Sequence, residues 1–117
     1  MSVEKNYFVI AGCDLTNSIT DEFEDWTYTD RYDDYRHNQV KGEIQLFDDP
    51  MSGRHLYLGY ILAAGDEYEC DTAKFTVSDI QDKEVMVREK LNELISLGVI
   101  KGNQDYKYQV IAFEECH

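Results

Sequence analysis

The segment Gly42–Gly65 constrains the fold more than any other part of the chain. Its second half, His55–Ala64, is apolar at odd and at even positions, and successive side chains of a strand point to opposite faces of a sheet. A strand that is apolar on both faces needs cover on both sides, so we expect it at the centre of a sheet. A helix can cover one face, whereas the aromatic residues between positions 14 and 37, or a second copy of the chain, would cover the other.

The first half of this segment predicts a partner strand over Gly42–Asp48. Ile44 and Leu46 would face the core. Glu43 and Gln45 would face away from it. The sequence DDPMSG that follows favours a turn, because aspartate before proline initiates turns and glycine accepts a positive φ. The segment therefore predicts a hairpin.

Three other segments have the apolar, aromatic and β-branched residues of strands, and we expect strands at Asn6–Cys13, Ala73–Val77 and Tyr106–Phe113. The segment Asp14–Gln39 has no regular period. A short helix and a structured loop both fit its first half, and an edge strand fits Trp26–Thr29. Because its second half mixes tyrosines with aspartates and has no aliphatic residue, we expect an exposed excursion there.

One long helix is predicted over Asp79–Leu97. Ser78, with Gln81 three residues later, has the form of a capping box at its start. Gly98 can take the left-handed conformation that ends a helix. The buried face of this helix would consist of aliphatic residues that recur with the period of 3.6 residues, namely Ile80, Val87, Leu91, Leu94 and Ile95.

These elements predict a single compact α+β domain that spans residues 1–117. We expect an antiparallel or mixed sheet of about five strands, with one long helix packed on one face. In sequence order the elements would be a strand, the irregular segment, three strands, the helix and a last strand. The length of 117 residues is typical of one domain, and a hydrophobic content of 43% argues against disorder.

The cysteines and the lengths of the apolar runs indicate the cellular compartment in which the protein is expected. Cys13, Cys70 and Cys116 cannot all form disulfides within one chain. No signal peptide precedes the first predicted strand, and no apolar run approaches the ~20 residues of a membrane span. We therefore expect a cytoplasmic protein with reduced thiols and no membrane contact.

The residues that usually bind metals or carry catalysis form no known pattern. His37, His55 and His117 are not combined with cysteines at the spacing of a zinc site. The acidic clusters lack the spacing of a calcium-binding EF-hand. The chain also lacks a phosphate-binding P-loop, a nucleophile elbow and a dinucleotide fingerprint. We therefore expect no enzymatic activity, no metal and no cofactor.

The negative charge is the remaining functional signal. The net charge is −13, and residues 14–37 carry eight acids against two arginines, while residues 66–71 carry four acids and no base. Nucleic acids and anionic membranes would be repelled by such a chain, whereas a basic protein would be attracted. Acids in loops also serve solubility alone, and this simpler interpretation stays open.

The functional interpretation assigns partner binding to the two acidic segments. Their carboxylates would provide the charge, and the aromatic residues at their rim would be Trp26, Tyr28, Tyr32, Tyr35 and Tyr68. Of these, Trp26, Tyr32 and Tyr35 would act as anchors. The candidate partner-binding residues are Asp21, Glu22, Glu24, Asp25, Trp26, Asp30, Tyr32, Asp33, Asp34, Tyr35, Asp66, Glu67 and Glu69.

We expect an interaction module that inhibits a nuclease or another nucleic-acid-binding protein by masking its basic surface. Carboxylates spaced along a face can replace phosphates as partners of lysine and arginine. In size and charge the chain is similar to the anti-restriction and anti-CRISPR proteins of phages and mobile elements, which act as DNA mimics. One alternative is an immunity or antitoxin-like protein that neutralises a basic toxin. Another is an enzyme of unrecognised type, which needs a pocket with convergent carboxylates or a perturbed histidine. A homodimer is compatible with each of them.

Overall fold

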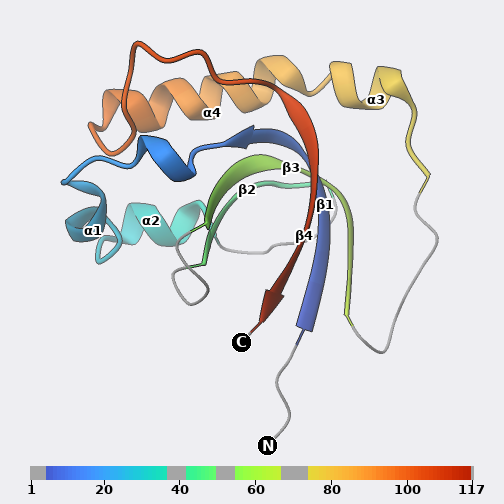
Figure 1. Cartoon of the computed structure of the whole chain (residues 1–117), viewed down its shortest axis with the longest axis horizontal. Helices are drawn as coiled ribbons and strands as arrows, with labels where there is room; N and C mark the ends of the chain where they lie inside the picture. Colours follow the sequence, from blue (N-terminus) through green and yellow to red (C-terminus); the bar gives the residue numbers. More distant parts are fainter. Residues whose placement is uncertain (1–4, 37–41, 50–54, 67–73, 117) are drawn as a thin grey trace, which may run out of the picture.

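The structure is a computed structural model that describes residues 5–36, 42–49, 55–66 and 74–116. Its four strands form one antiparallel sheet in the order β2-β3-β1-β4, and the long helix α4 runs across the sheet (Figure 1). The elements in chain order are β1 (Lys5–Asp14), the short 3-10 helix η1 (Thr16–Ser18), α1 (Phe23–Trp26), α2 (Asp30–Asp34), β2 (Ile44–Asp49), β3 (His55–Asp66), α3 (Val77–Gln81), α4 (Glu84–Ser96) and β4 (Gln109–Cys116). The predicted α+β class with an antiparallel sheet and a long helix is confirmed.

The prediction of a strand at Ala73–Val77, which would have given the sheet five strands, is wrong for the part that the structure describes. Residues 74–76 have no regular structure, and Val77 is the first residue of α3. The Thr76 hydroxyl accepts a hydrogen bond from the Asp79 amide (3.1 Å), and the Asp79 carboxylate accepts one from the Thr76 amide (2.9 Å). This capping box starts a helix, so the alternating residues Phe75 and Val77 stay exposed instead of entering the sheet.

The predicted long helix is divided into two. α3 ends at Gln81 and α4 begins at Glu84, and the capping box lies at Thr76 rather than at the predicted Ser78. The end of α4 agrees with the prediction, because Gly98 follows it with a φ of 80°. Of the predicted buried face, the structure buries Val87, Leu91 and Leu94 and half-buries Ile80 and Ile95.

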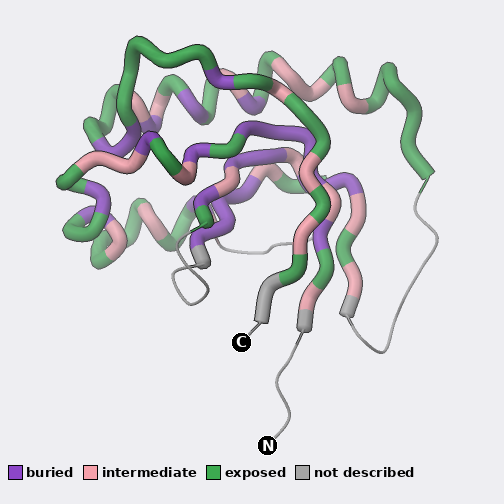
Figure 2. Tube along the Cα trace, in the orientation of Figure 1, coloured by how far each residue is buried: buried purple, intermediate pink, exposed green. Residues whose placement is uncertain are grey.

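Strand β3 is buried on both faces, as predicted. Leu56 and Leu58 lie in the larger core, which α4 covers with Leu91. On the opposite face, Ile61 lies in a smaller core. Figure 2 shows that the buried residues are concentrated where the strands pass beneath α4. The hairpin of β2 with β3 is also present, with Leu46 opposite Leu58.

The cover of the second face differs from both predicted alternatives. The ring centroids of Phe47 on β2 and Phe113 on β4 are 5.0 Å apart, although these strands are the two edges of the sheet. In a flat sheet, three strand spacings would separate them by roughly 14 Å. The sheet is therefore strongly curled (Figure 1). Side chains from its own strands form the smaller core. The curl also explains why Gln45, predicted to face away from the core, is only 4% exposed.

The curl is accompanied by a close approach of two backbones. Gly12 on β1 lies opposite Gly59 on β3, and the β1–β3 register shifts between Val9 and Ile10. A Cβ atom on Gly12 would lie 1.9 Å from the carbonyl oxygen of Leu58. Only glycine fits at this position, because any side chain would overlap the neighbouring strand.

Candidate functional site

Helix α2 divides its acidic residues from its aromatic residues. Asp30, Asp33 and Asp34 are spaced at i, i+3 and i+4, which places them together on one helix face, and all three are exposed. Tyr32 and Tyr35 are also three residues apart and face inward, where Tyr35 is buried and Tyr32 half-buried. The edge strand predicted at Trp26–Thr29 is replaced by the end of α1 and a turn.

Helix α1 makes the same division. Phe23 and Trp26, three residues apart, are buried in the larger core. The acidic residues before and within this helix, Asp21, Glu22, Glu24 and Asp25, are exposed. We call the seven exposed carboxylates of residues 21–34 the acidic surface.

The buried rings form one aromatic cluster beneath the acidic surface. The Trp26 ring centroid lies 5.8 Å from that of Phe23, 5.5 Å from Tyr32 and 5.6 Å from Tyr35. Trp26 and Tyr35 are therefore core residues and are not exposed anchors, because their side chains are 9% and 6% exposed. Burial of these rings holds a segment of short helices in a fixed conformation.

Tyr28 is the exposed aromatic side chain of this segment, at 87% exposure. The sequence indicated it as one of the aromatic residues at the rim of the acidic segments, but not as an anchor. Helical spacing identifies it, because Tyr28 lies two residues after Trp26 and cannot share the buried face of a helix with it.

Glu93 of α4 connects α2 to the body of the protein. It accepts a hydrogen bond from the Tyr35 hydroxyl and pairs with Arg31 at 3.0 Å. The hydrogen bond from Tyr35 holds the pKa of the Glu93 carboxyl below its usual value, and burial raises the pKa of Tyr35. These groups surround a cavity of about 150 Å³, which Lys90 also lines. The backbone carbonyl of Tyr35 accepts a hydrogen bond from the Leu46 amide (2.8 Å), which joins α2 to β2.

A second connection holds the end of α2. The Arg36 guanidinium donates to the Tyr32 hydroxyl (2.7 Å), which donates to the carboxylate of Asp48 (3.1 Å). Asp48 is 6% exposed, and burial raises the pKa of Tyr32. Both arginines of this segment, Arg31 and Arg36, are thus bonded to groups of the protein itself, while the seven carboxylates lie at the surface.

The second predicted acidic segment lies largely outside the described residues. Glu67, Tyr68 and Glu69 belong to the part that is not described. Asp66 is known only as the last residue of β3. The candidate site that the structure brings together therefore consists of the acidic surface and its aromatic cluster.

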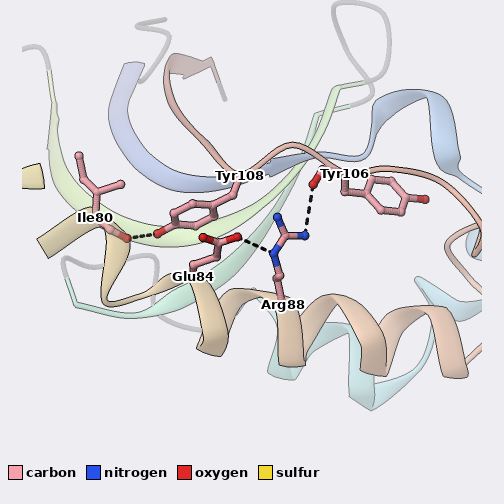
Figure 3. A network of polar contacts seen from close by, with 5 residues as sticks. All are labelled: Ile80, Glu84, Arg88, Tyr106 and Tyr108. Atoms are coloured by element: carbon pink, nitrogen blue, oxygen red, sulfur yellow. Dashed lines mark hydrogen bonds and ion pairs between the residues drawn. The ribbon is translucent and has the colours of Figure 1, made fainter. Parts of the chain in front are cut away.

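A separate polar network lies between α4 and the chain that leads into β4 (Figure 3). Arg88 donates to Glu84 (2.7 Å) and to the backbone carbonyl of Tyr106 (3.2 Å), and the Tyr108 hydroxyl donates to the carbonyl of Ile80. Burial raises the pKa of Tyr108 to about 12. These bonds hold the segment before β4 against α4.

An open cavity of about 410 Å³ lies beside this network, lined by α4 and by residues 102–106. Cys13 on β1 is fully buried, and this burial raises the pKa of its thiol, which makes it a poor nucleophile. Across the described ranges, no three histidine, cysteine or acidic residues are grouped so that they could hold a metal ion. None of the described helices is both long and apolar enough to cross a membrane.

Comparison of the chain with known protein families, with curated proteins and with solved structures finds no match.

Proposed function

We propose that this protein binds a basic, nucleic-acid-binding surface of another protein through its acidic surface and inhibits that protein by masking it. The observation that carries the proposal is the division of residues 21–34 into buried aromatic rings and seven exposed carboxylates. Acidic residues that serve only solubility do not need to be held in a fixed conformation. Here the aromatic cluster, Glu93 and the β2 backbone all hold the segment in place.

The chemistry of the acidic surface fits lysine and arginine as partner groups. Residues 21–34 contain seven acids and a single base, Arg31, which is bonded to Glu93. Carboxylates form strong charge-assisted hydrogen bonds with guanidinium and ammonium groups, as phosphates do. Opposite potentials also speed the encounter of the two proteins, and salt screens this attraction. Tyr28 provides an exposed aromatic ring within the surface, the role that Trp26 and Tyr35 cannot fill.

The test begins with affinity capture of the partner and mass spectrometry, followed by binding assays with the purified pair. We expect binding to weaken steeply as salt is raised and to compete with double-stranded DNA. Reversal of three charges on α2, in the variant Asp30→Lys/Asp33→Lys/Asp34→Lys, should abolish binding.

The matched control reverses three exposed acids outside the acidic surface and so makes the same change in net charge. These acids are Asp82, Glu89 and Asp105, each changed to lysine. Equal loss of binding in both triple variants would mean that net charge alone attracts the partner. Simultaneous binding of DNA and this protein to the partner would refute the masking mechanism, and a toxic partner without nucleic-acid affinity would instead favour the antitoxin-like alternative.

A further inference from the structure

The two edges of the sheet are not equivalent. On the outer side of β2, the Leu46 amide donates to the backbone carbonyl of Tyr35 (2.8 Å), so α2 occupies this edge. On the other edge, β4 pairs with β1 alone among the described residues. An open edge presents unpaired backbone donors and acceptors that can pair with another strand.

Strand β4 lacks several features that usually protect an open edge, and its charged residues, Glu114 and Glu115, lie only at its C-terminal end. It pairs with β1 over eight consecutive residues without a register shift, so no bulge interrupts it. Its sequence, QVIAFEEC, contains no proline and no lysine. Val110 is 44% exposed, and Ala112 is exposed two residues later on the same face. On the adjacent strand β1, Tyr7 adds a side chain that is 43% exposed.

We propose that β4 pairs with β4 of a second copy of this chain, which makes the two curled sheets continuous across a two-fold axis. Among the described residues, Tyr35 at the end of α2 bonds to the β2 edge, whereas β4 has no strand on its outer side, and a two-fold β4–β4 pair closes at two chains. This inference is independent of the proposed function, since the acidic surface lies on α1 and α2.

Charge and apolar contacts favour an antiparallel pair centred on Ile111. In this register Val110 of one copy faces Ala112 of the other, so exposed apolar residues cover each other. The pairing also places Glu114 of one copy beside the start of β4 in the other copy, close to Lys107, which precedes that strand. A parallel pair would instead lay Glu114 beside Glu114, and like charges directly opposite each other are destabilising.

Sedimentation velocity of the full chain over a wide range of concentration tests the dimer. We expect the mass to rise from the 13.7 kDa of one chain to twice that value. The variant Val110→Lys/Ala112→Lys brings four positive charges together at the two-fold axis and should weaken the dimer at least about tenfold. The matched control, Val77→Lys/Val85→Lys, adds the same charge at valines that are 69% and 67% exposed on α3 and α4, and it should leave the dimer intact. A wild-type chain that stays monomeric, or a β4 variant that still dimerises, would overturn the proposal.

Disulfide trapping tests the register. In a background with Cys70→Ser and Cys116→Ser, chains with Val110→Cys are mixed with chains with Ala112→Cys under oxidising conditions. Opposite residues of an antiparallel pair lie within disulfide reach, whereas diagonal ones do not. A link in the mixture but in neither variant alone supports the register. The absence of any link, or equal links within each variant alone, would overturn it.

Salt separates this inference from the proposed function. Each copy carries a net charge of −13, so screening reduces the repulsion between the two copies. We expect the dimer to be at least as strong at about 1 M salt as at about 0.15 M, whereas partner binding should weaken. A dimer that dissociates as salt is raised would contradict pairing through β4.

Discussion

Replacement of Trp26 by alanine tests whether the aromatic cluster is a core or a binding surface. Trp26 is 9% exposed and packs against three aromatic rings, with centroids 5.5–5.8 Å away. Truncation of such a buried ring costs about 3–5 kcal/mol, because it removes apolar contacts and leaves a cavity. This is a large share of the roughly 5–15 kcal/mol that stabilises a domain, and it should lower the melting temperature by on the order of 10–20 °C.

Two further variants sharpen the measurement. Tyr28→Ala removes an aromatic ring of the same segment that is 87% exposed, so we expect a change in the free energy of unfolding within about 0.5 kcal/mol. The indole nitrogen of Trp26 is buried without a hydrogen-bond partner among the described residues. Trp26→Phe removes this donor together with part of the ring, and the two effects offset, so the variant should lose no more than about 1.5 kcal/mol.

The assay is urea denaturation followed by circular dichroism. Trp26 is the single tryptophan of the chain, so its fluorescence in the wild-type protein also reports burial directly. We expect blue-shifted emission that acrylamide quenches weakly. A loss below about 1 kcal/mol in Trp26→Ala, together with a large loss in Tyr28→Ala, would refute the assignment of Trp26 to the core.

Three further predictions concern the elements around the site. Thr76→Ala should destabilise the start of α3 by about 1 kcal/mol, whereas Ser78→Ala, which is not at the N-cap, should have little effect in hydrogen exchange. Gly12→Ala should cost at least about 3 kcal/mol in chemical denaturation, because its Cβ atom would lie 1.9 Å from the backbone of the adjacent strand, and a folded variant of normal stability would contradict this geometry. The pKa of Tyr108 is raised from 10.0 to about 12, so its neutral form stabilises the fold fully below pH 10 and this contribution is lost as the pH rises through 12. Tyr108→Phe should remove that part of the alkaline stability loss, and unchanged curves of stability against pH would contradict it.

The sequence predicts those elements whose signal is local. Apolar residues on both faces of β3 predicted its central place, since alternation is a property of the strand itself. The start of α3 shows two local signals in conflict, because Phe75 and Val77 alternate as in a strand while Thr76 and Asp79 form a capping box. The capping box satisfies backbone amides and decides the conformation. Alternation over five residues was too short to predict a strand.

The curl of the sheet could not be predicted, because it depends on contacts between distant residues. Phe47 and Phe113 come into contact only after three strand pairings have formed, and the sequence around either residue does not predict this contact. The burial of Gln45 follows from that curl. The division of α2, in contrast, is encoded locally, since Tyr32 and Tyr35 share one helical face and the aspartates share the other. The sequence left open whether these tyrosines are core or surface residues, because no aliphatic residue marks the buried face of this segment.

The acidic surface should lower the stability of the protein that carries it. Asp30 and Asp34 form a like-charged pair at a spacing of four residues on α2, and such a pair destabilises a helix by roughly 0.2–0.5 kcal/mol. Asp21 and Asp25 have the same spacing across the turn that leads into α1, where their like charges also repel. Neutralisation of one acid in each pair, in the variant Asp25→Asn/Asp34→Asn, should therefore raise the melting temperature at low salt. The gain should disappear at about 1 M salt, where the repulsion is already screened.

The same variant should bind the basic partner less tightly, because two of the seven carboxylates are lost. Opposite changes in stability and binding are expected of a surface kept for function, since selection for stability alone would remove the repulsion. A matched variant at exposed acids elsewhere, Glu89→Gln/Asp105→Asn, should change neither property to the same extent. If Asp25→Asn/Asp34→Asn left stability at low salt unchanged and bound the partner with full affinity, the seven carboxylates would act only as solubilising charge, and the masking proposal would lose its physical basis.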